Sequence, residues 1–289
     1  MEYIHRNLLY IVLGTLALAV FMIWYNVFYF ESRQNLLITF FDVGQGDAVF
    51  MESPDGNQIL IDGGPDKTIL YKLGQTLPFW DRSLDLLILT HPHADHLDGL
   101  LEVLKRYKVG MVMEPGILHS IPEYQEWRNL LEEKKIPVVF VRAGQKIKIG
   151  DDFYFDILSP FEDISGQSRK NPHDGTVVTR LVHGENSFLF MGDAEKPIEY
   201  RLVWEGDAVL DSDVLKVGHH GSKTSSTKEF LEVVTPEIAI IQVGKKNRYG
   251  HPTQEVLDRL STVGAKVLRN DMGGNIMIIS DGVGYWVKN

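Results

Sequence analysis

The sequence predicts an α/β protein made of two β-sheets flanked by helices, preceded by one apolar N-terminal segment. After residue 35, short apolar runs typical of strands outnumber helix-period stretches by about two to one. Most connections between them are short, which favours two packed sheets over a single doubly wound parallel sheet. No long linker rich in Pro, Gly or Ser divides these roughly 250 residues, so we expect residues 36–289 to form one domain.

The first element of the chain is an apolar segment at residues 8–30, which contains no charged residue. As a helix it would be roughly 35 Å long, enough to cross a hydrocarbon core of about 30 Å. Trp24, Tyr25 and Tyr29 lie near its C-terminal end, where aromatic residues meet a membrane interface. A buried core helix or a cleaved signal peptide is the alternative, but signal peptides usually have small residues at this end. We therefore expect residues 1–35 to be a retained membrane anchor.

The charges that flank this segment predict its orientation. Arg6 precedes the segment, whereas Glu31 and Arg33 follow it. This slight bias places the N-terminus inside the cell and the rest of the chain outside the cytoplasm. The absence of cysteine is compatible with an oxidising compartment. We expect a single-pass protein of the cell membrane.

The remaining elements follow from the spacing of apolar residues. The segment 161–175 is polar and rich in turn-forming residues, and we expect it to be a loop. The expected helices are residues 96–105, 124–134, 196–204, 228–233 and 253–262. The expected strands are residues 36–43, 48–52, 58–61, 84–90, 138–141, 153–158, 177–182, 187–191, 214–217, 238–243, 266–268, 276–280 and 284–287.

Composition limits the chemistry that the chain can perform. The chain has no cysteine, which excludes disulfides, thiolate zinc fingers, iron–sulfur clusters and a cysteine nucleophile. A metal site must therefore use histidine, carboxylate, backbone carbonyl or water. The formal net charge of −10 also disfavours sequence-independent coating of DNA, because the phosphate backbone repels an acidic surface.

The densest group of chemically active side chains directly follows the strand expected at 84–90. It contains His91, His93, Asp95 and His96. Imidazole and carboxylate are ligands that zinc and manganese accept. If the strand continues, its alternation points His91 and His93 the same way, towards one ion. A tight turn can then place Asp95 and His96 beside a second ion. A solvated polar loop would explain one His-x-His pair but not this density.

Three further candidates lie after other apolar runs or in a loop. Asp193 follows a strand, and a carboxylate there could bridge two cations about 3.5–4 Å apart. His219 and His220 follow another strand, so that one could complete a metal site while the other contacts substrate. His251 lies just before an expected helix. The alternative explanation for Asp193 is a Gly-Asp turn, and the alternative for His251 is an exposed helix-entry loop.

Together these motifs resemble the metallo-β-lactamase superfamily, whose signature is His-x-His-x-Asp-His. More narrowly, the chain is similar to the hydrolase domain of the ComEC family of DNA-uptake proteins. The matching segments occur in the family's order and cover nearly everything after residue 35. They are residues 41–48, 61–64, 91–96, 190–195, 213–222 and 249–252.

The resemblance implies a four-layer αββα sandwich with a dinuclear site for two divalent ions, zinc or manganese, at one edge. The implied ligands are His91, His93, Asp95, His96, Asp193 and His220. Of these, the first two would hold one ion, Asp95 and His96 the other, and Asp193 would bridge them. His220 would complete the second site while His219 faces the substrate, or the reverse. Asp62 would orient the histidine cluster.

The chain departs from the family at residues 171–176. Many superfamily members supply a further histidine to the first metal from this region, whereas ComEC-like chains usually carry an Asn-rich stretch followed by serine. Here either His173 or Asp174 could be that ligand, or neither. ComEC-like proteins also carry a many-helix channel, and this chain has one candidate span. A role in DNA uptake, with channel proteins as partners, is therefore not carried over directly.

The expected activity is hydrolysis of a phosphodiester, with DNA as the favoured substrate. Two ions would lower the pKa of a bridging water towards 7 and stabilise charge on the phosphate. The residues expected to act in catalysis are Asp95, which is also a ligand, His219 and His251. Those expected to contact substrate are Ser222, Lys245, Lys246 and Tyr249. The two lysines, with Arg248, would form a basic rim that attracts DNA to the site. The alternative is that they lie in a solvated loop with no role in binding.

Two alternatives remain open from the sequence. One is hydrolysis of another substrate, such as cell-wall phosphocholine, a small nucleotide, a β-lactam or a thioester, because a fold does not determine its chemistry. The other is a non-catalytic, membrane-tethered module of DNA uptake that has kept the fold. A degenerate module would be expected to lack several ligands, whereas only the region around His173 is irregular.

Overall fold

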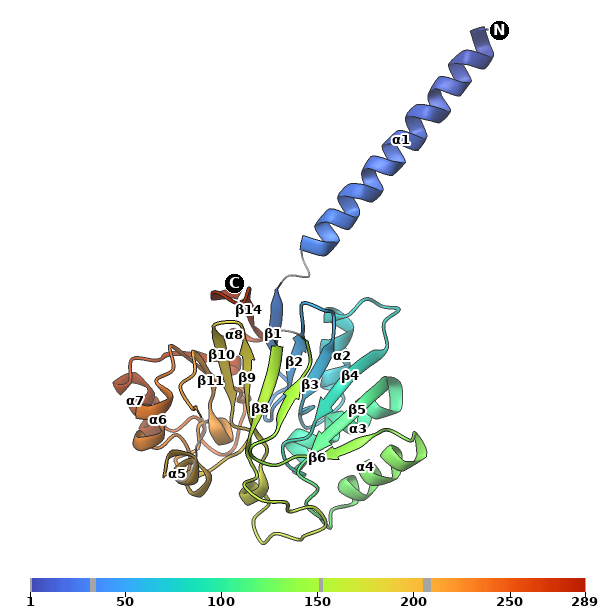
Figure 1. Cartoon of the computed structure of the whole chain (residues 1–289). Helices are drawn as coiled ribbons and strands as arrows, with labels where there is room; N and C mark the ends of the chain where they lie inside the picture. The colour runs from blue at the N-terminus through green and yellow to red at the C-terminus, as the bar shows by residue number, and fades with distance from the viewer. Residues whose placement is uncertain (1, 32–34, 151–152, 205–208, 289) are drawn as a thin grey trace.

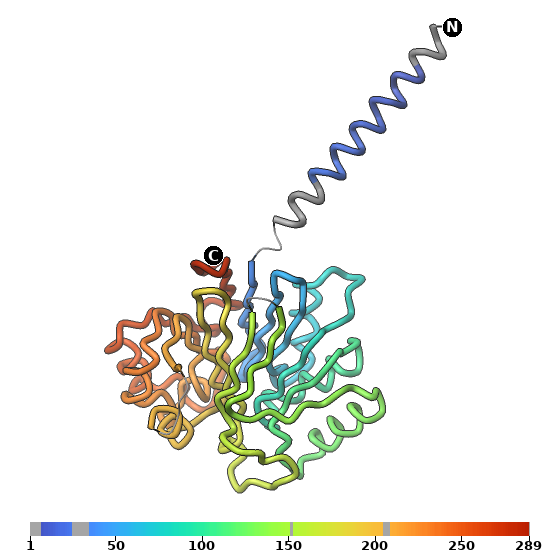
Figure 2. The backbone as a smooth tube through the Cα atoms, viewed as in Figure 1, coloured from blue at the N-terminus to red at the C-terminus, as the bar shows by residue number. Residues whose placement is uncertain are grey.

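A computed structural model of the chain describes residues 2–31, 35–150, 153–204 and 209–288, with residues 2–6 and 25–31 described by their backbone alone. Two β-sheets pack face to face, and helices cover the outer face of each (Figure 1). Figure 2 shows that the first part of the chain builds one side of this sandwich and most of the later part the other, with the C-terminal end returning beside the first strand. The predicted αββα architecture is confirmed.

The first sheet combines the early strands with the last two strands of the described chain. These are β1 (Leu36–Phe40), β2 (Val49–Glu52), β3 (Gln58–Ile61), β4 (Ser83–Ile88), β5 (Lys108–Glu114), β6 (Val138–Phe140), β14 (Ile276–Ser280) and β15 (Tyr285–Lys288). Their order is β15-β14-β1-β2-β3-β4-β5-β6. The helices of this half are α2 (Thr68–Thr76), α3 (Ala94–Arg106) and α4 (Pro122–Glu133).

The second sheet has seven strands in the order β13-β12-β11-β10-β9-β8-β7. They are β7 (Lys146–Lys148), β8 (Phe153–Ser159), β9 (Val178–His183), β10 (Asn186–Phe190), β11 (Val214–Lys216), β12 (Ile238–Ile241) and β13 (Lys266–Arg269). The helices of this half are α5 (Lys196–Trp204), α6 (Lys228–Val234), α7 (Gln254–Thr262) and α8 (Asn270–Gly273). Two 3₁₀ turns, η1 (Pro172–Gly175) and η2 (Gly218–Gly221), precede β9 and follow β11.

Three apolar clusters fill the spaces between the four layers. The cluster between the sheets contains Phe40 from the first sheet and Phe190 from the second, whose ring centroids are 6.1 Å apart. A second cluster packs α2, α3 and α4 on the first sheet and includes the fully buried Trp127. A third packs α5, α6 and α7 on the second sheet. Each sheet is therefore apolar on both faces.

Most predicted elements are present, and the exceptions have clear causes. Neither α2 nor β5 was expected from the sequence. The helix α2 is short and follows a turn-rich segment, which weakens its periodic signal. The strand β5 reads KVGMVME, and its glycine and terminal charges hide a run whose last three residues are buried. The edge strand β7 was not expected either, because charged residues at both of its ends hide its short apolar pattern.

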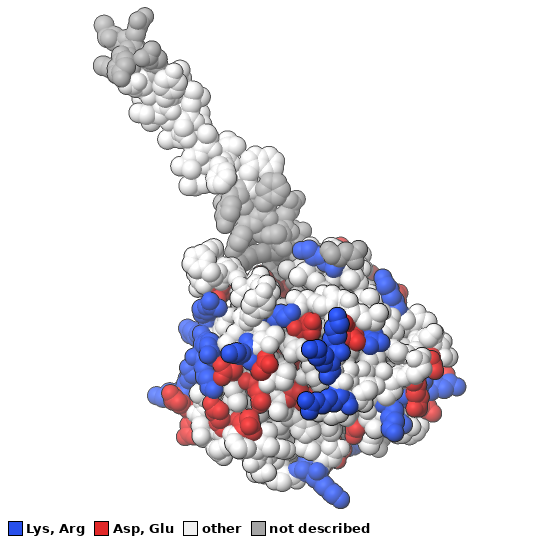
Figure 3. Space-filling model, turned by 180° about the vertical axis from the view of Figure 1, so that it is seen from behind, with Lys and Arg blue, Asp and Glu red and all other residues white. Residues whose placement is uncertain are grey.

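The apolar N-terminal segment is a single helix, α1 (Glu2–Glu31), which projects away from the sandwich (Figure 1). Its most apolar window, Asn7–Trp24, is long and apolar enough to cross a membrane and buries none of its surface against the domain. Figure 3 shows no Lys, Arg, Asp or Glu on its described part. Trp24 is 57% exposed, whereas the side chains of Tyr25 and Tyr29 lie outside the described residues.

The contact between the N-terminal half of α3 and the loop after β3 admits no side chain. The Gly63 N–H donates to the His96 carbonyl at 2.8 Å, and the Gly99 N–H donates to the Gly64 carbonyl at 2.9 Å. A Cβ at Gly99 would lie 1.8 Å from the Gly63 carbonyl oxygen. This close approach sets how far the start of α3, with His96, lies from the end of β3.

Replacing Gly99 by alanine should therefore lower the free energy of unfolding by at least about 2 kcal/mol, because backbone atoms cannot yield as side chains do. Gly74→Ala is the matched control on the neighbouring helix, since no atom lies within 4 Å of its added Cβ. It should raise stability by about 0.5–1 kcal/mol through helix propensity. Chemical denaturation measures both, and equal stability of the two variants would contradict this account of the contact.

Candidate metal centre

The sequence-predicted histidines and aspartates gather at one edge of the sandwich, where β4, β10 and β11 end. A cavity of about 240 Å³ opens there. Because β1, β3 and β4 run in one direction, this edge lies opposite the one at which β1 begins. The residues that line the cavity are Gln45, His93, Asp95, His173, Asp193, His219, His220, Tyr249 and His251.

The histidine motif adopts a different local structure from the one expected. The strand does not continue through it: β4 ends at Ile88, and α3 begins at Ala94. His93 is the N-terminal capping residue of α3, so Asp95 and His96 lie in the first helical turn. The prediction of strand alternation followed by a tight turn was wrong. A carboxylate in the first turn is favoured by the helix dipole, and the motif therefore also begins a helix.

One buried carboxylate orients two of the imidazoles. Asp62 accepts hydrogen bonds from the Thr90 hydroxyl at 2.7 Å and from His96 Nδ1 at 2.7 Å. Because the Thr90 hydroxyl donates to Asp62, its oxygen is left to accept from His91 Nδ1, 3.1 Å away. Both rings therefore carry a proton on Nδ1, and Nε2 is the nitrogen left to bind an ion. Asp62 holds a left-handed backbone conformation (φ 56°), which is costly for a residue with a side chain.

His220 is oriented in the same way by a different partner. Its Nδ1 lies 2.9 Å from the Gln242 carbonyl, which can only accept, so Nδ1 carries the proton. The ring is 2% exposed, and its Nε2 lies 3.3 Å from an Asp95 carboxylate oxygen. The Gln242 side-chain amide donates in turn to the Phe41 and Ala48 carbonyls, which fixes this segment against the first sheet.

Asp193 lies at the centre of the cluster. Its carboxylate oxygens are 3.4 Å from His96 Nε2, 3.6 Å from His220 Nε2 and 3.8 Å from His91 Nε2. His219 Nε2 and His173 Nδ1 lie 3.8 and 3.9 Å away. One buried carboxylate is thus surrounded by five imidazoles at 3.4–3.9 Å, distances that suit an intervening cation.

The donor atoms fit divalent ions. Among the described residues, His91 Nε2, His96 Nε2, His220 Nε2 and Asp193 Oδ1 are buried without a hydrogen-bond partner, which is costly unless a cation binds them. Four groups of histidines and carboxylates among the described residues have ligand atoms within 4.8 Å of one another, and two of these groups divide the His91–His96 motif between them without sharing a residue. The first group is His91, His93 and His173, and the second is Asp95, His96, Asp193 and His220.

The departure at residues 171–176 places His173, and not Asp174, in this cluster. Asn171 Oδ1 accepts from the His173 backbone N–H at 3.2 Å, which closes the 3₁₀ turn η1. This turn brings the His173 ring to 4.5 Å from His93 and 5.1 Å from His91, measured between centroids. His173 Nδ1 is buried and has no hydrogen-bond partner among the described residues.

Sequence reasoning gave no role to a buried ion pair beside the cluster. The Lys216 ammonium, at the end of β11, contacts the Asp47 carboxylate and also donates to the Gly192 carbonyl at 3.1 Å. Asp47 lies 3.3 Å from His220 Nδ1. Lys216 and Asp47 are each 2% exposed. Two features of the sequence could have indicated this ion pair. Asp47 follows Gly44-Gln45-Gly46 with no assigned role, and Lys216 lies inside an otherwise apolar strand.

Burial and neighbouring charges shift the pKa values of these groups strongly. Burial lowers the pKa of His93 to about 4, and the nearby His173 and His96 rings add to the effect. Burial acts to raise the pKa of Asp95, but the charges of His96 and of the nearby His220 outweigh it and lower the pKa to about 2. Burial likewise opposes a raised pKa at His220, and the carboxylates of Asp193 and Asp47 raise it to about 10.

The residues expected to contact substrate are distributed unevenly. Three of them line the cavity, namely His219, His251 and Tyr249. The ring centroids of His219 and His251 are 5.8 Å apart, and the Tyr249 ring stacks on that of His251. Ser222 is buried, and its hydroxyl contacts Thr224 instead of the cavity. Lys245 and Lys246 are exposed in the loop after β12 and do not line the cavity.

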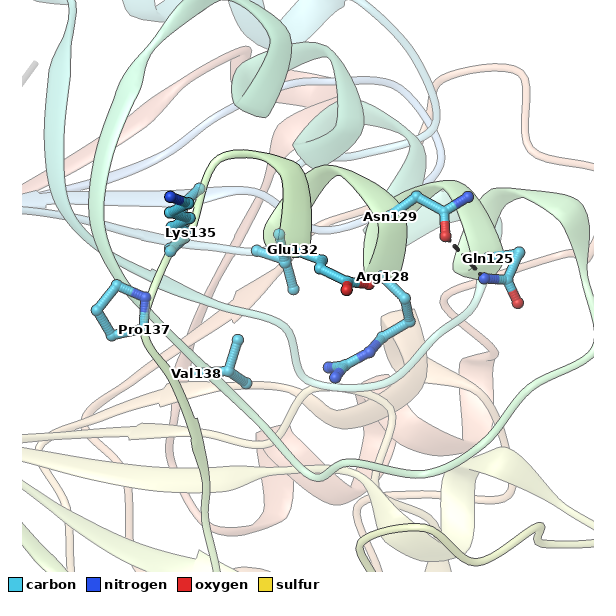
Figure 4. A pocket seen from close by; sticks show the side chains of 9 residues that line it. Gln125, Arg128, Asn129, Glu132, Lys135, Pro137 and Val138 are labelled. Atoms are coloured by element: carbon cyan, nitrogen blue, oxygen red, sulfur yellow. Dashed lines mark hydrogen bonds between the residues drawn. The ribbon is translucent and has the colours of Figure 1, made fainter.

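A larger cavity of about 510 Å³ lies beside α4 and β6, away from this cluster (Figure 4). None of the sequence-predicted site residues lines it. Arg128, which does, donates to the buried Glu114 at 2.6 Å and lies over the Phe140 ring. Its charge is therefore engaged within the fold, and the cavity offers no grouping of histidines.

Comparison with known proteins agrees with this geometry. Residues 41–245 match the family model described as the metallo-beta-lactamase superfamily. The chain belongs to the metallo-β-lactamase superfamily. This match spans both halves of the sandwich and includes every candidate ligand, and the fold of this superfamily binds divalent metals.

The curated relatives of this metallo-β-lactamase chain include a competence protein. It is 34% identical over 252 residues to "ComE operon protein 3" of Bacillus subtilis, an alignment that covers 81% of this chain and 32% of the relative. It is 33% identical over 243 residues to "Competence protein ComA" of Neisseria gonorrhoeae, covering 82% and 31%. The predicted likeness to the ComEC family is confirmed. The chain spans about a third of the length of these relatives.

Solved structures share the metallo-β-lactamase fold at low sequence identity. The metallo-beta-lactamase fold protein YhfI from Bacillus subtilis aligns with a TM-score of 0.56 at 12% identity, covering 88% of this chain and 100% of that one. CmlA, a diiron β-hydroxylase from Streptomyces venezuelae, aligns with a TM-score of 0.53 at 17% identity, covering 81% and 52%. These likenesses support the architecture.

The position of Asp193 predicts a specific loss of metal. Asp193→Asn should lower the metal content of the purified protein from about two ions per chain to one or fewer, because the central carboxylate belongs to the second ligand group and also lies within 3.9 Å of His91 and His173 of the first. Asp98→Asn is the matched control, since Asp98 lies on α3 near Asp95 but belongs to neither ligand group. Elemental analysis gives the stoichiometry, and full metal content in the Asp193 variant would contradict the central role.

The buried ion pair predicts a double-mutant cycle. Lys216→Met should lower the unfolding free energy of the metal-free protein by about 3–5 kcal/mol, because it leaves the buried Asp47 carboxylate without its cation. The double variant Asp47→Asn/Lys216→Met should recover most of this loss, since both charges are then removed. Denaturant unfolding in a chelator measures each variant. Additive losses in the double variant would show that the two side chains do not stabilise one another.

Proposed function

We propose that the protein is a membrane-anchored, metal-dependent phosphodiesterase that cleaves DNA. The observation that carries the proposal is the buried Asp193 carboxylate amid five imidazoles, four of which have a buried nitrogen atom without a hydrogen-bond partner among the described residues. Such a donor set matches a two-metal hydrolytic site. The competence proteins among the relatives support DNA as the substrate.

In this proposal His91, His93 and His173 would hold one divalent ion, and Asp95, His96, Asp193 and His220 would hold a second. Imidazole and carboxylate donors suit zinc best and also accept manganese. Ions bound there lower the pKa of water and neutralise phosphate charge. Asp62 and Gln242 keep the imidazole rings in the tautomer that offers Nε2, so no ring has to reorient when an ion binds.

His219 and His251 are proposed to act on the substrate side of the cavity. His219 is 23% exposed, whereas the adjacent His220 is 2% exposed and has its Nε2 near Asp95 and Asp193. This contrast favours His220 as the ligand and His219 as the residue that contacts the phosphate. Burial lowers the pKa of His251, so at neutral pH its ring is neutral and can accept or donate a hydrogen bond at the leaving oxygen.

The loop after β12 is proposed to guide the DNA backbone. Tyr249 is 70% exposed at the cavity rim and provides a ring on which a base can stack. Lys245 and Lys246 lie four and three residues before it and supply local positive charge in a chain of net charge −10. Ser222, through Thr224, lies near His219 Nδ1 and is proposed to position that ring instead of contacting DNA.

The apolar helix α1 supports an activity located at a membrane. We propose that residues 1–35 form a single-pass anchor, that residues 36–289 form the catalytic domain, and that this domain lies outside the cytoplasm. Together with the competence relatives, this arrangement supports action on DNA during uptake, beside channel proteins.

A nuclease assay on the full chain in detergent tests the activity. Loaded with zinc or manganese, the protein should cleave single- or double-stranded DNA, and His91→Ala should lower kcat/KM at least about 10³-fold because a ligand is lost. His219→Ala should lower kcat at unchanged metal content, whereas His220→Ala should lower metal content. Asp98→Asn serves again as the control that keeps the wild-type rate.

Other outcomes of this assay discriminate the alternatives. Cleavage of a small phosphodiester, a phosphocholine, a β-lactam or a thioester, without cleavage of DNA, would assign the site to another hydrolase. Stoichiometric metal without turnover of any of these substrates would refute the catalytic proposal. Less than one ion per chain would point to a non-catalytic module.

A further inference from the structure

Two aromatic side chains project from the sandwich at the edge opposite the candidate metal centre. Phe79 and Trp80, in the connection between α2 and β4, are 80% and 73% exposed. Their ring centroids are 4.8 Å apart in an edge-to-face arrangement, so they form one apolar projection. Aromatic side chains of this size are rarely left in water without a partner.

Printed contacts across the first sheet locate this projection beside the start of β1. Asp81, next to Trp80, accepts from the Gln58 side chain at 2.8 Å. Gln58 is paired with Glu52, and Glu52 with Leu37 in β1. The projection therefore lies about three strand spacings, roughly 14 Å, from the first strand. Figure 1 shows the α2–β4 connection at the end of the domain where α1 joins it.

The covalent link to α1 keeps this edge near the membrane. Five peptide steps separate Glu31 from Leu36, and such a segment reaches at most about 18 Å. The turn between β14 and β15 lies at the same edge, because Leu36 pairs with Ser280, and its Val283 is 76% exposed. A tether this short raises the effective concentration of the edge at the bilayer, so even a weak apolar contact becomes populated.

We infer that Phe79 and Trp80 insert into the lipid interface and hold the domain on the bilayer with its cavity turned away. The inference rests on the anchoring part of the proposed function. Trp and Phe suit the interface between headgroups and acyl chains, where apolar rings are buried at shallow depth. Strands of three to seven residues separate the two edges of the sheet, so the cavity then opens on the side away from the lipid.

The absence of cysteine allows this orientation to be measured directly on the full chain. Single variants Phe79→Cys, Met272→Cys and Leu18→Cys carry an environment-sensitive fluorophore in phosphatidylcholine nanodiscs that hold one copy each. Met272 is 79% exposed and lies at the opposite edge, two residues after Asn270, whose side chain donates to the Phe40 carbonyl at the end of β1. Leu18 lies within the apolar window of α1 and reports the anchor.

Nitroxide lipids should quench the label at position 79 at least about twofold more than the label at position 272. Adding Trp80→Asp should reduce the quenching at position 79 to the level at position 272, whereas adding Trp80→Tyr should retain it. Equal quenching at positions 79 and 272, with strong quenching at position 18, would overturn the docking while the anchor stands. Absence of quenching at position 18 would refute the anchor and, with it, the docking that depends on it.

Discussion

The hydrogen bonds of the buried Asp62 carboxylate control the geometry of the candidate centre. Asp62 binds His96 directly and His91 through Thr90, and so determines which nitrogen of each ring faces the cavity. To do so it holds a left-handed backbone conformation at the end of β3. The close contact between Gly63 and Gly99 then fixes the distance between this carboxylate and α3. Altering Asp62 would therefore change the orientation of donors on two different segments at once.

The two halves of the sandwich contribute complementary groups. The first half supplies His91, His93, Asp95 and His96, and the second supplies His173, Asp193 and His220. Gln242 and Lys216 connect these halves, because both are in the second sheet region and contact carbonyl or carboxylate groups near β1 and β2. The centre is thus a property of the packed sheets, and its stability is linked to the whole core.

Much of the architecture could be predicted from the sequence because apolar runs, turns and the histidine motif are local signals. The two-sheet sandwich and the family likeness followed from them. What the sequence could not reveal depends on contacts between distant segments. The role of Asp47 requires knowledge that Lys216 lies beside it, and the choice of His173 over Asp174 depends on the turn η1. Charged termini similarly concealed β5, whose burial comes from packing against its neighbours.

The position of β1 has a consequence for unfinished or shortened chains. This strand, with its buried Leu36, Ile38 and Phe40, lies between β2 and β14, although β14 follows every candidate metal ligand in the sequence. Until β14 arrives, one side of β1 presents unpaired N–H and carbonyl groups flanked by apolar side chains. Such an open edge templates strand addition from other copies. Loss of the last two strands would thus produce an aggregating species even though every candidate metal ligand is still present.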